Sequence, residues 1–226
     1  LYPANINSEN KISNLINEEN IILIKWENKL NTFERMFSNL ENLIEVNFSN
    51  IDTSEVTSME YMFSGCYNLK AINFNNINTS LVKSMEGMFL KCHSLTSLDM
   101  SSFNTPSLTT MKFMFKDCYS LTSLDLSNLD TSKVNFMVST FNNCTSLKYL
   151  DISNFDRSSV LSMLSMFSFC NSLTSLDLSH FNTSLVVAFS QMFNGCISLI
   201  SINVSNFNLS SCSLMGLMFC NCTSLE

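Results

Sequence analysis

Residues 121–134 read LTSLDLSNLDTSKV, and the apolar positions of this stretch return at a constant interval along the chain. Leu121 is followed by Leu147 and Leu173, each 26 positions further on, with no insertion between the copies. The same interval separates seven cysteines: Cys66, Cys92, Cys118, Cys144, Cys170, Cys196 and Cys222. A fixed period of this length indicates a repeat array. Each unit of such an array buries its apolar side chains against its neighbours, so no single unit folds alone.

Within one unit, the pattern of apolar residues changes from a period of two to a helical spacing. Leu124 and Leu126 alternate with polar residues, which predicts a strand with one buried face. Asp130-Thr131-Ser132 is a turn signal, and a segment such as 56–58 is expected to be briefly extended. Met59, Met62, Phe63 and Cys66 then fall three and four residues apart, which predicts a helix of about two turns. Residues equivalent to Ser58 stand where a helix N-cap belongs. The prediction is therefore an α/β solenoid of parallel strands and short helices.

The first 35 residues depart from the repeat and are expected to form an N-terminal cap, with the array running over residues 36–226. Ile12, Leu15 and Ile16 suggest a short helix, and residues 21–26 suggest a strand whose Trp26 covers the open end of the core. Terminal units of solenoids are atypical because one face meets water. The array stops in mid-repeat at Glu226 and no signal peptide is evident at Leu1, so we expect a fragment of a longer protein.

Composition limits the classes of function. Hydrophobic residues make up 46% of the 226 positions, which is enough for a continuous core, whereas charged residues make up only 14%. The net charge is −7, which disfavours nucleic acid as a partner. With four glycines there is no Gly-rich phosphate-binding loop. The longest apolar run, at residues 20–26, is far too short to insert into a membrane.

The cysteine column suggests buried thiols rather than disulfides. Each member has apolar neighbours, and free cysteine is among the most buried residue types. Equivalent Cα atoms on adjacent coils are within reach of a disulfide, yet a ladder points its side chains in parallel, so bridges remain the less favoured alternative. One cysteine per coil without a histidine in phase does not assemble a tetrahedral zinc site. The seven are therefore predicted to be structural, with no metal and no cofactor.

Two stretches resemble a known repeat family. Residues 121–134, and the Met-Phe-x-x-Cys-x-x-Leu element at Met62–Leu69, are similar to the consensus of the BspA-like leucine-rich repeats, the bacterial surface protein 26-residue repeat. The similarity extends from about residue 36 to the end. It implies a right-handed leucine-rich-repeat coil with a long parallel sheet on one face and short helices on the other. It also implies a cell-surface or secreted location and a role in adhesion or protein binding, with a protein partner or a host or extracellular-matrix surface.

The outward face of the expected sheet holds the candidate binding residues. Its central column contains four consecutive aspartates, Asp99, Asp125, Asp151 and Asp177, and Tyr149 interrupts an adjacent column that is otherwise rich in serine. One hypothesis is a strip that attracts Ca²⁺ or a basic partner. The alternative is a solvated consensus column without a ligand. We favour the solvated column over the strip, and Ca²⁺ is a possible but not an expected ligand.

No constellation of catalytic residues stands out. The two histidines, His93 and His180, occupy different phases of the repeat, and the repeated acids indicate architecture rather than a unique acid–base pair. We therefore predict a non-enzymatic domain. Two hypotheses remain: a surface-exposed module for protein binding or cell adhesion, and a structural spacer of seven coils, roughly 34 Å long, that holds another domain away from its anchor.

Overall fold

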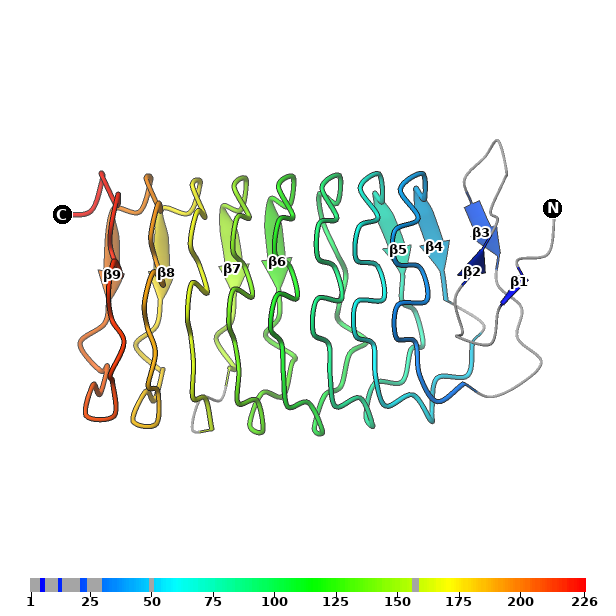
Figure 1. The fold of residues 1–226 in the computed structure, drawn as a ribbon, viewed down its shortest axis with the longest axis horizontal. Helices are drawn as coiled ribbons and strands as arrows, with labels where there is room; N and C mark the ends of the chain where they lie inside the picture. The colour runs from blue at the N-terminus through cyan, green and yellow to red at the C-terminus, as the bar shows by residue number, and fades with distance from the viewer. Residues whose placement is uncertain (1–4, 7–11, 14–20, 24–29, 49–50, 156–158) are drawn as a thin grey trace.

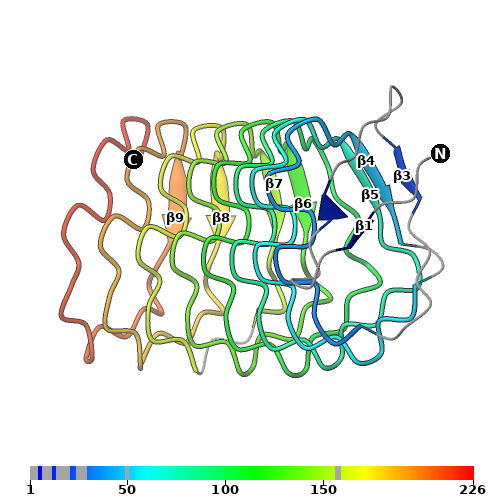
Figure 2. The same ribbon diagram turned by 45° about the vertical axis from the view of Figure 1, so that its right-hand side comes forward.

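The structure, a computed structural model, describes residues 5–6, 12–13, 21–23, 30–48, 51–155 and 159–226. The coils lie side by side in chain order along the long axis, from β4 toward one end to β9 at the other (Figure 1). The view turned by 45° shows the same coils stacked as nearly equal loops (Figure 2). No helix among the described residues is long and apolar enough to cross a membrane.

Short parallel strands form one side of the solenoid, each three residues long. They are β3 (Ile21–Leu23), β4 (Glu45–Asn47), β5 (Ala71–Asn73), β6 (Ser123–Asp125), β7 (Tyr149–Asp151), β8 (Ser175–Asp177) and β9 (Ser201–Asn203). Equivalent positions pair across coils, as Leu124 does with Leu150. In strands β4 to β9 the middle residue packs against the core: Leu124, for example, is 2% exposed while its neighbours are exposed. The predicted period of two is therefore present.

The long continuous sheet that we predicted is instead interrupted. The strands form three separate sheets, β3-β4-β5, β6-β7 and β8-β9, and residues 97–99 are not in a strand. The interruptions separate Asp99 from Asp125 and Asp151 from Asp177. Like charges on neighbouring strands weaken pairing, although Asp125 and Asp151 remain paired.

The prediction of short helices is wrong, because the described residues contain no helix. The segment after Ser58 is a chain of tight turns in which two residues of each coil have positive φ, for example Tyr61 at 51° and Gly65 at 75°. Amide groups alternate between two acceptors: Met62 N donates to Met59 O within the coil, and Phe63 N donates to Met88 O of the next coil. A helix would direct every amide to its own segment, so hydrogen bonding between coils replaces it.

The residues predicted to cap these helices cap turns instead. The hydroxyl of Ser58 accepts a hydrogen bond from Glu60 N at 3.3 Å, and Ser84 does the same for Glu86 N. The expected brief extended segment is present as a ladder of single-residue parallel bridges, which includes Ser58 with Ser84 and Ser84 with Thr110. This ladder is the second line of backbone pairing between coils.

The core runs uninterrupted through the stack. Phe63, Phe89 and Phe115 are fully buried and stack with ring centroids 5.7 and 5.3 Å apart and nearly parallel planes. The methionine and leucine columns are buried beside them. The repeat columns read from the sequence are therefore the interior of the solenoid.

The N-terminal segment is described only in part. The strand expected over 21–26 is present at Ile21–Leu23, where β3 pairs in parallel with β4. Residues 12–13 form β2 (Ile12–Ser13), antiparallel to β1 (Asn5–Ile6), where we expected a helix. Trp26 lies outside the described residues, so its role as a lid stays a prediction, as does the 1–35 cap.

Candidate functional site

Each member of the aspartate column closes a turn. Asp125, Asp151 and Asp177 end the strands β6, β7 and β8, whereas Asp99 lies in a segment that is not a strand. Asp125 Oδ1 accepts hydrogen bonds from Ser127 N at 2.9 Å and from Ser127 Oγ at 2.7 Å. Asp99, Asp151 and Asp177 each accept a 2.9 Å bond from the backbone amide two residues later. One carboxylate oxygen of each aspartate therefore has a structural role.

The same contacts favour the charged form of Asp99, Asp151 and Asp177. Hydrogen bonds from the side chain and backbone of Ser101 lower the pKa of Asp99. Equivalent serines lower the pKa of Asp151 and Asp177. Bonds to the ionised form favour it, so the column is negative at neutral pH. The described residues contain no group of three or more His, Cys, Asp or Glu side chains that could hold a metal ion.

Tyr149 projects from the same face. Its side chain is 58% exposed, the joint highest value among the large hydrophobic residues, and its hydroxyl donates to Asp151 Oδ2 at 3.4 Å. The nearby negative charge of Asp151 raises the pKa of Tyr149. The tyrosine and the aspartate are therefore presented together, on adjacent columns of β7.

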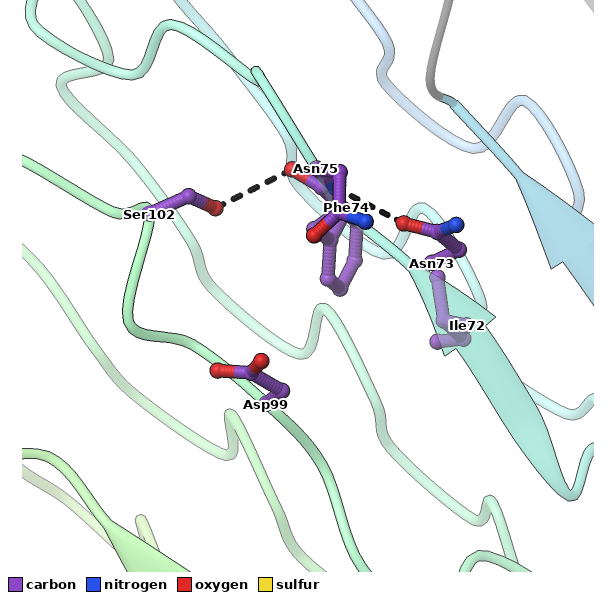
Figure 3. Close-up of a pocket in the computed structure, with 6 residues that line it drawn as sticks. All are labelled: Ile72, Asn73, Phe74, Asn75, Asp99 and Ser102. Atoms are coloured by element: carbon purple, nitrogen blue, oxygen red, sulfur yellow. Dashed lines mark hydrogen bonds between the residues drawn. The ribbon is translucent and has the colours of Figure 1, made fainter.

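A pocket of about 230 Å³ lies beside β5, where the sheet is interrupted. Its lining consists of Ile72, Asn73, Phe74, Asn75, Asp99 and Ser102 (Figure 3). Asn73 Oδ1 accepts a bond from Asn75 N at 2.9 Å, and Ser102 Oγ donates to Phe74 O at 3.0 Å. Of the predicted site residues, only Asp99 contributes to this pocket.

The sequence analysis missed the other polar residues of the pocket. The next coil carries Asn128 where this one carries Ser102, and the Asn128 amide reaches Met100 O and Phe103 O of the preceding coil. Ser102 is shorter and reaches only Phe74 O. In the sequence, the signal that could have revealed this pocket is the serine at position 102, where the next coil has an asparagine.

The cysteine column faces the core. Six of its members are buried, Cys222 is partly buried, and all nine cysteines of the chain are free. Each thiol in the column donates to the carbonyl of a phenylalanine 29 residues earlier, as Cys118 does to Phe89 at 3.1 Å. Burial raises the pKa of Cys66 and Cys196 to about 12. These thiols are therefore poor nucleophiles at neutral pH.

The side chains of the two histidines contact groups other than the cysteine side chains. The ring of His93 stacks between Tyr67 and Tyr119, with centroids 4.8 and 4.5 Å apart. His180 Nε2 lies 3.1 Å from Ile152 O. Neither histidine forms a described contact with a cysteine, so the geometry supplies no Cys-His pair.

Comparison with known families assigns the repeat to a family. A family model described as "Mycoplasma protein of unknown function, DUF285" matches residues 31–149 and 118–226, so the chain belongs to this family. The family is a BspA-like repeat family, which confirms the resemblance inferred from the sequence. No curated protein matches the chain.

Solved structures show the same kind of fold. A leucine-rich repeat protein from Bacteroides ovatus is 17% identical, with a TM-score of 0.51 over 93% of this chain and 55% of the other. The chain thus spans about half the length of that protein. A leucine-rich cell surface protein from Faecalibacterium prausnitzii is 19% identical, with a TM-score of 0.39 over 85% of this chain and 67% of the other. The first likeness confirms the repeat solenoid and, at this identity, the fold alone.

Proposed function

We propose that this chain is a non-enzymatic protein-binding module of a cell-surface or secreted protein, and that it binds through the outward face of its short strands. The observation that carries the proposal is the presentation of Tyr149 beside Asp151 on β7. Tyrosine is enriched at protein interfaces because it combines a large apolar ring with a hydroxyl. The equivalent positions of the neighbouring coils hold Ser123 and Ser175, so the repeat itself does not call for a tyrosine here.

The charge of this face defines the kind of partner. Asp125, Asp151 and Asp177 follow one another along the face, and the chain as a whole carries a net charge of −7. A basic protein surface therefore experiences a favourable long-range field. Adhesion to a host or extracellular-matrix protein is the form of binding that the family resemblance supports.

The alternative is a structural spacer. It is supported by the turn-closing role of the aspartates, because that role explains the column without any ligand. It is also supported by the uniform serines of the adjacent column, Ser97, Ser123 and Ser175. The spacer hypothesis accounts for the stacked coils but does not account for the exposed Tyr149.

A binding assay with matched variants separates the two. The labelled chain is titrated onto cultured cells and onto extracellular-matrix proteins, beside Tyr149→Ala, Asp151→Asn and, as a control in the turn segment, Lys112→Ala. The module predicts saturable binding that weakens about tenfold or more in the first two variants, as expected for interface hot spots, and is unchanged in the third. Absence of saturable binding supports the spacer.

A further inference from the structure

The pocket between β5 and the following coil, which carries Asp99 and Ser102, offers a set of hydrogen-bond acceptors. Asp99 uses Oδ1 to close its turn, which leaves Oδ2 without a described hydrogen bond. Ser102 donates its hydroxyl hydrogen to Phe74 O, so its oxygen can still accept a hydrogen bond from another donor. Asn73 Oδ1 accepts one bond from Asn75 N and has capacity for a second. Asp99, Asn73 and Ser102 all line one pocket of about 230 Å³ (Figure 3).

The pocket has a negative charge without a described counter-ion. Among the residues that the structure describes, Asp99 has no ion pair. Its lining contains no Lys or Arg. Hydrogen bonds from Ser101 lower the pKa of Asp99, so the carboxylate is ionised at neutral pH. A neutral donor would gain only a hydrogen bond from this carboxylate, whereas a cation would also gain the attraction between opposite charges.

We propose that this pocket binds the side-chain ammonium group of a lysine in the partner protein. An ammonium group has three donors and no acceptor, which matches the oxygens of Asp99, Asn73 and Ser102. Arginine fits less well, because its planar fork prefers both oxygens of a carboxylate and Asp99 Oδ1 is already engaged.

The inference rests on the proposed function, since it identifies a lysine of the bound protein as an anchor at the same face. It adds a specific contact that the sheet face alone does not require. It also places that contact two coils from Tyr149, which extends the interface along the solenoid.

The test uses peptides in place of the unidentified partner. Acetyl-Gly-Lys-Gly-amide is titrated into the ¹⁵N-labelled chain, and the amide shifts of Asn73, Asn75 and Ser102 are followed by NMR. We expect saturable shifts, which disappear when the lysine is Nε-acetylated because the charge and two donors are lost. Asp99→Asn should weaken binding about two- to fivefold, as expected for an ion pair at an exposed site. The matched variant Asp130→Asn, at a turn-closing aspartate outside the column, should bind normally.

The Asp99→Asn variant is expected to fold, because Asn47, Asn73 and Asn203 occupy the same position in other coils and Asn203 closes the same turn. Equal binding of the acetylated peptide, equal binding by Asp99→Asn, or no saturable shift would each overturn the inference. The outcome is independent of the cell-binding assay. Tyr149→Ala can abolish cell binding while the peptide still binds Asp99, and the pocket can fail while cell binding persists.

Discussion

The thiol of Cys118 donates a 3.1 Å hydrogen bond to the carbonyl oxygen of Phe89, 29 residues earlier in the chain. The neighbouring coils repeat the contact, from Cys92 to Phe63 at 3.3 Å and from Cys144 to Phe115 at 3.2 Å. A small side chain with a weak donor therefore fits between the turns and gives a second hydrogen bond to a carbonyl that already accepts a backbone amide, as Phe89 O does from Cys92 N at 3.1 Å. This explains why cysteine recurs at this position without any disulfide.

Thiol reactivity should follow burial. The thiols of the last coil, Cys212, Cys220 and Cys222, are only partly buried, whereas the other six are buried. Because the thiolate is the reactive species and burial raises the pKa of the inner cysteines, we expect three thiols to react with a neutral-pH thiol reagent in the folded chain. All nine should react after denaturation. A denatured count below nine would reveal disulfides and contradict the ladder.

The phenylalanine stack should dominate the stability of the array. Phe115 is fully buried between Phe89 and Phe141, at centroid distances of 5.3 and 5.7 Å. Phe115→Ala should lower the free energy of unfolding by about 3–5 kcal/mol, because it removes apolar contacts and leaves a cavity. Tyr149→Ala, at an exposed site, should change it by less than about 0.5 kcal/mol. Urea unfolding measures both, and similar values for the two would refute this account of the core.

Gly87 should tolerate no side chain while the Tyr61 ring lies over it. Its φ is +57°, and an added Cβ would overlap atoms of the Tyr61 ring. Gly87→Ala is therefore expected to cost about 1–3 kcal/mol. Gly216→Ala, where no atom lies within 4 Å of the added Cβ, is the control and should be nearly neutral. In the Tyr61→Ala background the cost of Gly87→Ala should fall, and a double-mutant cycle without coupling would be the contrary result.

The interior of this fold could be predicted from the sequence, but the backbone path could not. Met59, Met62, Phe63 and Cys66 bury their side chains as their spacing indicated. A spacing of three and four residues is produced equally by a helix and by consecutive turns. What distinguishes them is hydrogen bonding to the next coil, which is not local. Positive φ at Tyr61 leaves no trace in the sequence, because tyrosine is not a residue that signals a turn.

For the candidate site, the sequence predicted which residues face outward but not the pocket. The outward position of Asp99 follows from strand alternation, and its exposure agrees. The pocket depends on Ser102 being too short to reach as far as Asn128 does. It depends also on the interruption of the sheet at residues 97–99. Both are consequences of how two coils meet, so a reading of one coil at a time did not reveal them.

The aspartate column should make stability fall in acid. Hydrogen bonds from the serines two positions later lower the pKa of Asp99, Asp151 and Asp177 in the folded chain. Because the folded pKa lies below the unfolded value near 3.9, these groups stabilise the fold above about pH 4, and the contribution is lost as the pH falls through the folded pKa. A variant with all three replaced by Asn keeps an acceptor oxygen for each turn but cannot titrate there. Urea unfolding between pH 6 and pH 3 should show a smaller loss of stability for this variant than for the parent chain, whereas parallel pH profiles would show that the column does not contribute.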